Sequence, residues 1–257
     1  MILAAGLGTR LKELTKDKPK ALVEVAGKPL LQRNIENLVA QGFDTIVINI
    51  HHFGDQIVDF VEQHHFDAKI LISDERGALM DTGGGIVQAL PYFRDTQAVL
   101  VHNVDILSDV DLRAYYDGFL RSNDDAWLLT QDRQTSRKLL FDADQLLIGW
   151  RNLNDGSFKW VNGAKEGFKE LAFNGIHVFK PSIFETYPVQ RYSIIDLYLE
   201  LATQHKIRSQ EIQPNFWFDI GKINDFNKID NFIRHCERSE AIQPDPNWIA
   251  SVVPPSQ

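Results

Sequence analysis

Residues 3–31 read LAAGLGTRLKELTKDKPKALVEVAGKPLL, and this stretch does most to decide the fold. Gly6 and Gly8 follow a short apolar run at the start of the chain. A glycine-rich turn after a first strand lets backbone N–H groups approach a phosphate closely, because glycine has no Cβ and tolerates positive φ. The stretch therefore predicts a phosphate-binding loop directly after the first strand.

Strand-like and helix-like segments alternate through the first half of the chain. Runs rich in β-branched residues predict strands at 1–4, 45–50, 68–73 and 98–103. Helical periodicity lies between them, at about 29–41, 54–63, 83–90 and 109–122. Pro29 and Gly42 stand near the start and just past the end of the first helix, where helix termini favour these residues. The alternation predicts an α/β fold with a Rossmann-like, mainly parallel central sheet flanked by helices.

From about residue 125 the pattern changes to short strands separated by Asn, Asp and Gly. The predicted strands are 126–130, 138–142, 145–150, 157–161 and 171–179. A helix at about 194–204, strands at 207–213 and 216–221, and a helix at about 222–235 follow. We expect one domain over 1–236, made of halves at about 1–124 and 125–236, the second β-rich and mixed. Residues 237–257 are expected to form a C-terminal tail.

Composition limits the class of protein. The 257-residue chain has a formal net charge of −8, which argues against a general nucleic-acid surface. Its single cysteine, Cys236, excludes an internal disulfide and a multi-cysteine metal site, and suits a reducing cytoplasm. No charged-then-apolar leader and no apolar run approaching about 18 residues is present. We expect a soluble cytoplasmic protein that binds neither nucleic acid nor membrane.

The glycine loop matches neither of two common nucleotide motifs. A dinucleotide fingerprint needs a third glycine where Leu11 stands, and a Walker loop needs Ser or Thr where Pro29 follows Gly27 and Lys28. What remains is the segment from Gly6 to Arg10, followed by Lys20. Arg10 offers forked donors and Lys20 a compact charge, so together they could neutralise a triphosphate. Three further lysines are expected at the surface: Lys12, Lys16 and Lys18.

The whole stretch resembles the signature of the sugar-1-phosphate nucleotidyltransferases, in which L-A-A/G-G-x-G-T-R precedes P-K and V-x-G-x-P. The resemblance implies their nucleotide-diphospho-sugar transferase fold, with a nucleotide-binding first half and a sugar-phosphate-binding second half. It implies that Arg10 and Lys20 hold phosphates while the loop wraps the nucleotide. The loop residues expected to bind it are Leu3, Ala4, Ala5, Gly6, Gly8 and Thr9.

Residues 80–90, MDTGGGIVQAL, place three glycines at a predicted helix start. Glycine is unfavourable in a helix, so close backbone approach is expected there, although a flexible turn is the other interpretation. The segment resembles the family's LGTAG-type segment over the nucleobase, and its T-G-G-G form is most similar to the branch that contains N-acetylmuramate-1-phosphate uridylyltransferases. By this resemblance Thr82, Gly83 and Glu75 contact base or ribose.

Two aspartates follow apolar strands. Asp105 comes just after the strand at 98–103, where ligands of open α/β sheets bind, and a carboxylate there suits Mg²⁺. Asp219 ends a second apolar strand, and taken alone it fits a helix cap equally well. The segments resemble the family's N-G-D, with Val104 replacing glycine, and W-x-D-x-G-T. The resemblance implies that Asp105 and Asp219 bind Mg²⁺ and that Asn103 lies at the sugar.

Residues 173–179, FNGIHVF, resemble the family's N/S-x-G-I-Y-x-F strand, which makes Asn174 and Gly175 candidates for sugar contact. An ordinary strand explains them equally well. The histidines at 51, 52, 64 and 65 do not predict zinc, because adjacent side chains of a strand point to opposite faces.

The resemblance implies a Mg²⁺-dependent enzyme that joins a sugar 1-phosphate to a nucleoside triphosphate and releases pyrophosphate. The sugar phosphate itself attacks the α-phosphorus, so positioning and charge neutralisation suffice, with Arg10, Lys20 and Asp105 as the catalytic residues. The T-G-G-G segment favours UTP and N-acetylmuramate 1-phosphate. Mannose- or heptose-1-phosphate guanylyltransferase, phosphocholine cytidylyltransferase and a non-catalytic nucleotide-sugar-binding subunit are the alternatives.

Overall fold

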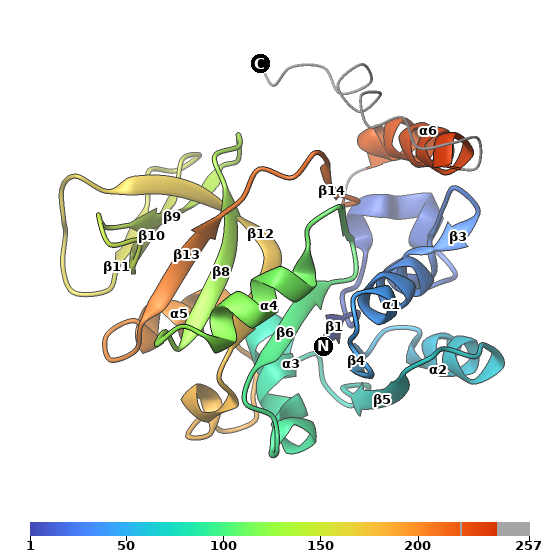
Figure 1. Cartoon of the computed structure of the whole chain (residues 1–257), viewed down its shortest axis with the longest axis horizontal. Helices are drawn as coiled ribbons and strands as arrows, with labels where there is room; N and C mark the ends of the chain where they lie inside the picture. The colour runs from blue at the N-terminus through green and yellow to red at the C-terminus, as the bar shows by residue number, and fades with distance from the viewer. Residues whose placement is uncertain (222, 241–257) are drawn as a thin grey trace.

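The computed structural model of the chain describes residues 1–221 and 223–240 (Figure 1). Its centre is a parallel group of strands in the order β6-β1-β4-β5. Their bounds are β1 Ile2–Leu3, β4 Thr45–Ile50, β5 Lys69–Asp74 and β6 Val99–Asn103. The predicted strands and the mainly parallel core are therefore confirmed.

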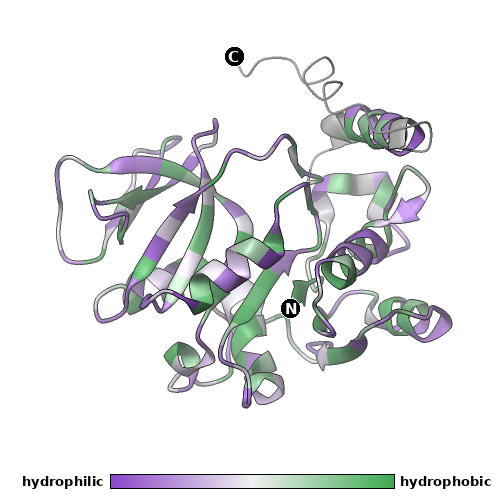
Figure 2. Ribbon diagram, in the orientation of Figure 1, coloured by the Kyte–Doolittle hydropathy of each residue, from purple (hydrophilic) through white to green (hydrophobic). Residues whose placement is uncertain are grey.

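Helices cover both faces of this parallel group. They are α1 Leu30–Ala40, α2 Gly54–Gln63, α3 Asp81–Ala89, α4 Leu112–Leu120 and, later in the chain, α5 Ile194–Leu201. Alternate residues of β4 divide between two cores: Ile46 and Ile48 share one with α1, α2 and α4, and Val47 shares the other with α3 and α5. The ribbon of β6 is hydrophobic for most of its length, as expected of a strand buried on both faces (Figure 2).

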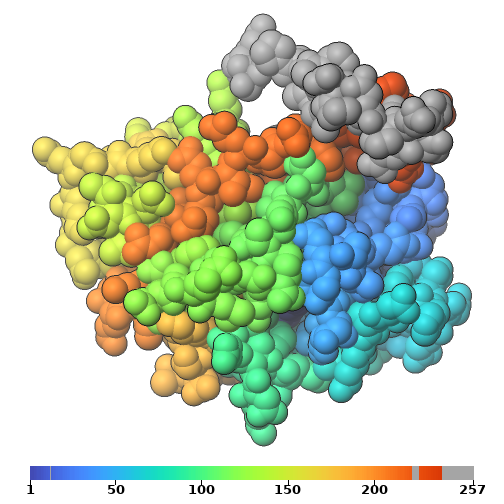
Figure 3. Space-filling view, in the orientation of Figure 1, coloured from blue at the N-terminus to red at the C-terminus, as the bar shows by residue number. Residues whose placement is uncertain are grey.

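The second half is β-rich, as predicted. Its strands are β8 Ala126–Gln131, β9 Arg137–Phe141, β10 Leu147–Asn152, β11 Phe158–Trp160, β12 Lys169–Phe179 and β13 Ile207–Glu211. β12 pairs antiparallel with β6, β8 and β9, so one ten-stranded mixed sheet runs through both halves. Figure 3 shows α4 at the surface between α1 and the strands of the β-rich half. The β-rich half is thus continuous with the loop-bearing half.

Shorter elements complete the fold. They are the strands β2 Glu24–Val25, β3 Lys28–Pro29, β7 Ile106–Ser108 and β14 Trp217–Asp219, and the 3₁₀ turns η1 Thr9–Thr15, η2 Lys20–Leu22, η3 Leu90–Phe93 and η4 Pro181–Phe184. β7 and β14 pair with each other outside the main sheet. Since they lie far apart in sequence, this pairing brings the C-terminal segment back to the end of β6.

The last helix, α6 Ile223–Glu240, is longer than predicted. It lies against the β2–β3 hairpin, where the Asp230 carboxylate accepts a 2.6 Å hydrogen bond from the Ala26 N–H. The tail expected from residue 237 is therefore helical through Glu240, and its remainder, 241–257, lies outside the described residues. None of the described helices has the length and apolarity needed to cross a bilayer.

Candidate active site

The glycine loop connects β1 to η1. Gly8 has a φ of 65°, and a Cβ there would lie 3.0 Å from Thr15 Cγ2 and 3.2 Å from Lys20 Cβ. A side chain at Gly8 would therefore be strained by backbone conformation and by contact. A Cβ on Gly6 would meet nothing within 4 Å, so this part of the loop faces open space. The loop thus combines a tight turn with a backbone that a ligand can reach.

A buried pair of polar side chains fixes the start of this loop. The Asn49 Oδ1 accepts hydrogen bonds from the N–H groups of Ala4 (2.6 Å) and Ala5 (3.3 Å). Its Nδ2 donates to Glu75 Oε1 at 2.7 Å. This hydrogen bond orients the amide so that its oxygen faces the loop. Glu75 is only 1% exposed, and burial is the main cause that raises its pKa. The expected contact of Glu75 with base or ribose does not match this position, because the carboxylate lies beneath the loop.

The three consecutive glycines allow close packing within the protein. The N–H of Gly83 donates to the carbonyl of Tyr192 at 2.9 Å, and a Cβ on Gly84 would lie 2.2 Å from the carbonyl oxygen of Gln190. A Cβ on Gly85 would lie 2.6 Å from Glu75 Oε1. The expected close approach is present, and its partner is the segment before α5, so the N–H of Gly83 is already paired within the protein.

A cleft of about 360 Å³ opens at the carboxyl ends of β1 and β6. Most of the residues predicted to bind nucleotide, sugar or metal line it: Leu3, Ala4, Ala5, Gly6, Gly8, Thr9, Arg10, Lys20, Thr82, Asn103 and Asp105. This is the edge of an open α/β sheet at which ligands bind. The structure therefore brings together, in one place, residues that come from four separate segments of the sequence.

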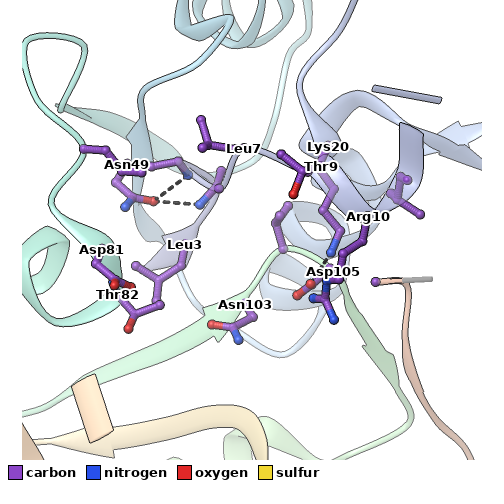
Figure 4. A pocket seen from close by; sticks show the side chains of 18 of the residues that line it. Leu3, Leu7, Thr9, Arg10, Lys20, Asn49, Asp81, Thr82, Asn103 and Asp105 are labelled. Atoms are coloured by element: carbon purple, nitrogen blue, oxygen red, sulfur yellow. Dashed lines mark hydrogen bonds and ion pairs between the residues drawn. The ribbon is translucent and has the colours of Figure 1, made fainter. Parts of the chain in front are cut away.

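The cleft has two chemically different ends. Figure 4 shows Lys20, Arg10 and Asp105 gathered at one end, while Asn49, Asp81 and Thr82 lie at the other. Lys20 is 7% exposed and forms an ion pair with Asp105 Oδ2. Each charge offsets part of the cost of burying the other, so the pair holds the ammonium in place. The first end suits phosphates, and the second suits a less charged group.

Asp219 reaches the charged end from the far part of the chain. In the β14–β7 pair Asp219 is opposite Ile106, and the N–H of Ile220 donates to the carbonyl of Asp105 at 2.8 Å. A Cβ on Gly221 would lie 2.6 Å from Asp219 Oδ1 and 2.8 Å from Arg10 Nη2, so a larger residue would displace these two charged groups. The pKa of Asp219 is raised, mainly by desolvation and to a smaller extent by the negative charge of Asp105. The positive charges of Lys20 and Arg10 lower this pKa and so oppose the shift.

These two aspartates suit a hard cation. Asp105 and Asp219 present carboxylate oxygens at the phosphate end, and their mutual repulsion is what a bound cation would relieve. In the part of the chain that the structure describes, no three His, Cys, Asp or Glu side chains are arranged to bind a metal. Two carboxylates are a donor set of the kind that Mg²⁺ accepts, since Mg²⁺ completes its coordination with phosphates and water.

The residues predicted for the sugar separate into two groups. Asn103 lines the cleft, whereas Asn174 and Gly175 do not. Gly175 has a φ of 77°, and a Cβ there would lie 2.7 Å from Asn103 Nδ2. It lies where the β12–β8 register shifts, so the irregular strand lets Asn103 lie against β12. The side chain of Asn174 is fully buried.

Other lining residues were not predicted. Asn49 could have been found, because it lies near the carboxyl end of the strand at 45–50, beside Leu3 of β1. Asp81 has a φ of 61°, and its Oδ2 lies 3.9 Å from Arg191 Nε at the opening of the cleft. No sequence pattern marks Arg191, because it reaches the cleft only through the tertiary contact between α3 and the segment before α5.

Comparison with known proteins agrees with this geometry. Residues 1–172 match the MobA-like NTP transferase domain. The chain belongs to the MobA-like NTP transferase family. It is 33% identical over 229 residues to the N-acetylmuramate α-1-phosphate uridylyltransferase of Caulobacter vibrioides, covering 86% of this chain and 90% of that one. The protein of that name from Neisseria meningitidis serogroup B is 32% identical, covering 87% and 93%.

The fold is also that of a solved structure. The crystal structure of HddC from Yersinia pseudotuberculosis complexed with GMP-PN is 25% identical, with a TM-score of 0.71, and covers 90% of this chain and 97% of that one. The nucleotidyltransferase family and fold that the sequence predicts are therefore confirmed.

Proposed function

We propose that this protein joins a sugar 1-phosphate to a nucleoside triphosphate, releasing pyrophosphate and forming a nucleoside-diphosphate sugar. One observation carries the proposal: a single cleft holds the glycine loop, Arg10, Lys20 and Asp105, and the Asp219 carboxylate lies beside Gly221 and Arg10 at the same end. A protein that only bound nucleotide sugars would not need two carboxylates beside the phosphate-binding cations. The proposed function is therefore catalytic.

In the proposed reaction an oxygen of the sugar phosphate attacks the α-phosphorus of the triphosphate. The bond between the α-phosphorus and the bridging oxygen breaks, and pyrophosphate leaves with its electron pair. Arg10 and Lys20 would neutralise the leaving pyrophosphate, while the loop from Leu3 to Thr9 orients the nucleotide. No side chain needs to act as a nucleophile.

We propose Mg²⁺ as the cofactor, held by Asp105 and Asp219. When bound, it supplies positive charge to the triphosphate and the incoming phosphate. The support is the chemistry of the donor set. Asp105 lies at the end of the cleft that carries Arg10 and Lys20 (Figure 4), and its charge acts on the Asp219 carboxylate, which lies beside Gly221 at that end.

For the substrates we propose UTP and N-acetylmuramate 1-phosphate. The support is that two relatives with this activity in their names match this chain over nine-tenths or more of their own length. The T-G-G-G segment at Thr82 is a second support, because it is the form typical of that branch of the family.

The test is a matrix of pyrophosphate-release rates that crosses ATP, CTP, GTP and UTP with N-acetylmuramate, N-acetylglucosamine, mannose and glucose 1-phosphates. We expect the highest kcat/KM for UTP with N-acetylmuramate 1-phosphate. A maximum for GTP with mannose 1-phosphate would replace the substrate assignment and keep the reaction class. Absence of release from every pair, by folded protein with Mg²⁺, would contradict the proposed function.

A further inference from the structure

Arg133 occupies an unusual environment in the segment between β8 and β9. Its guanidinium lies over the Trp217 ring, with Cζ 4.2 Å from the ring centroid. Nη2 donates to the carbonyl of Phe173 at 2.9 Å, and Nε donates to Asn174 Oδ1 at 3.4 Å. The side chain is half-buried and bound by neutral partners alone, so its positive charge is held away from water without a counter-charge.

Within the described ranges, no carboxylate forms an ion pair with Arg133. Burial lowers the pKa of Arg133, and the Asp219 carboxylate partly offsets this effect from a distance. Burying a cation away from water costs free energy, and binding an anion beside it offsets part of this cost. The remaining N–H groups of the guanidinium have no hydrogen-bond acceptor among the residues that the structure describes.

Asn174 adds a second unsatisfied donor beside Arg133. Its side chain is 0% exposed, and its Nδ2 has no hydrogen-bond partner among the described residues. Buried amide groups of native proteins are usually paired, so the immediate surroundings of Arg133 are rich in donors. Asn174 Nδ2 is closed off from solvent, whereas the half-buried guanidinium of Arg133 is not, so Arg133 is the donor that a phosphate oxygen could reach.

The two donors are held in position. The buried Lys138 Nζ donates to the backbone carbonyl of Arg133 at 2.7 Å, which fixes the segment that carries it. Trp217 Nε1 donates to the carbonyl of Asn174 at 3.1 Å, which fixes the irregular part of β12. Trp217 belongs to β14, the strand that ends at Asp219 and lies where the two halves of the molecule meet (Figure 1).

We infer that Arg133 binds the phosphate of the sugar 1-phosphate and orients it for attack on the nucleotide. The inference rests on the proposed function and deepens it. The nucleotide triphosphate is a less suitable ligand, because Arg10 and Lys20 already serve it and Arg133 does not line the nucleotide cleft. A guanidinium can bind a phosphate through two parallel hydrogen bonds, which also orients it.

N-acetylmuramate 1-phosphate carries a second anion, the carboxylate of its lactyl group, that an arginine could also bind. The stacking of Arg133 on Trp217 favours the phosphate, since Trp217 belongs to the same short strand as Asp219, whose charge acts on Arg133. N-acetylglucosamine 1-phosphate has the phosphate and lacks the carboxylate, so comparing the two sugar phosphates distinguishes the anions.

The experiment measures KM for each substrate in Arg133→Ala, Arg133→Lys and a matched control, Arg137→Ala. Arg137 is an exposed residue at the start of β9, close in sequence to Arg133. Arg133→Ala should raise KM for the sugar phosphate about 10- to 100-fold and leave KM for the nucleotide within about twofold, since a charge-assisted pair is lost. Arg133→Lys should fall between wild type and Arg133→Ala, because it keeps the charge but not the fork. Arg137→Ala should match wild type.

Calorimetric titration of the two sugar phosphates supplies an independent readout. Loss of affinity by a similar factor for both compounds in the Arg133 variants supports binding of the phosphate. Loss confined to N-acetylmuramate 1-phosphate would overturn the inference in favour of the carboxylate, and an equal rise of KM for the nucleotide would overturn it in favour of the triphosphate.

The two proposals fail separately. Normal turnover with an unchanged KM for sugar phosphate in both Arg133 variants would refute the role of Arg133 and leave the proposed function standing. Wild-type protein that binds the sugar phosphates through Arg133 but releases no pyrophosphate from any pair would refute the proposed function alone. Wild-type protein that shows neither binding nor release would refute both.

Discussion

A buried pair of opposite charges, Lys20 and Asp105, lies at the phosphate end of the cleft. Arg10 differs from this pair because it is exposed and forms no ion pair with a carboxylate in the described part of the chain. Removing Arg10 should therefore leave the fold intact, whereas Lys20 and Asp105 each compensate the burial of the other. Arg10 thus allows the chemistry of the site to be tested with little effect on stability.

Arg10→Ala should lower kcat/KM for pyrophosphate release by about 10²- to 10³-fold, the effect expected when one donor to developing charge is removed. The melting temperature should stay close to that of wild type. Lys16→Ala is the control, because Lys16 is an exposed cation a short distance along the same segment and is expected to play no part. An Arg10→Ala rate within about twofold of wild type would show that Arg10 does not serve the leaving group.

At the scale of elements, α3 is held close to β4 and β5 because its glycines leave room for other atoms. A Cβ on Gly85 would lie 2.6 Å from Glu75 Oε1 and 2.8 Å from Asn49 Nδ2. The hydrogen bond between these two side chains sets the orientation of the amide that accepts from the loop. The helix therefore acts on the nucleotide indirectly, through Glu75 and Asn49.

Gly85→Ala should lower the free energy of unfolding by about 1–3 kcal/mol, the usual cost of an added methyl group in a tightly packed interior. It should also raise KM for the nucleotide, since Asn49 would release Ala4 and Ala5. Gly77→Ala is the matched control because a Cβ at Gly77 would meet nothing within 4 Å. The measurements are urea unfolding and initial rates of both variants. Equal free energies of unfolding and equal KM values for the nucleotide in the two variants would contradict the packing argument.

The Glu75 carboxyl predicts a pH dependence of stability. Burial raises its pKa in the folded protein above the value of about 4.3 expected when unfolded, despite the opposing effect of Asn49 and His51. The folded state then binds the proton more tightly, so this group's contribution is fully present below the unfolded pKa and is lost as pH rises through the folded pKa. The negative charge of Asp81 also raises the pKa of Glu75, as burial does.

The measurement is urea unfolding of wild type and Glu75→Gln at several values between about pH 4 and pH 8. Glutamine does not titrate, so the free energy of unfolding of wild type relative to Glu75→Gln should be greatest at low pH and fall as pH rises. A difference that grows with pH would mean that the folded protein stabilises the ionised carboxylate, contrary to the burial argument.

At the scale of the whole molecule, the site forms where β12 and β14 connect the two halves. β12 extends the parallel sheet into the β-rich half, and β14 returns from the C-terminal segment to pair with β7. These connections place Asp219 near Arg10, which follows the glycine loop at the other end of the chain. A site assembled in this way depends on the whole fold.

This assembly explains how far the sequence could predict the structure. The glycine loop and Asp105 are local features, since each follows a strand directly and the pattern around it specifies its backbone. The contacts of Glu75 and Gly83 within the protein were not predicted, because their partners, Asn49 and the segment before α5, are set by tertiary packing. Arg133 was missed for the same reason: nothing in its neighbours along the chain indicates its contact with Trp217.

The rate of pyrophosphate release by Asp105→Asn, measured beside wild type with Mg²⁺ and with excess EDTA, tests the central claim most directly. Asparagine keeps the shape of the side chain and an acceptor for Lys20 but removes the charge that would hold the cation. We expect wild type to depend on Mg²⁺, and folded Asp105→Asn to be slower by about 10³-fold or more. Near-normal release by a folded Asp105→Asn protein would contradict the account.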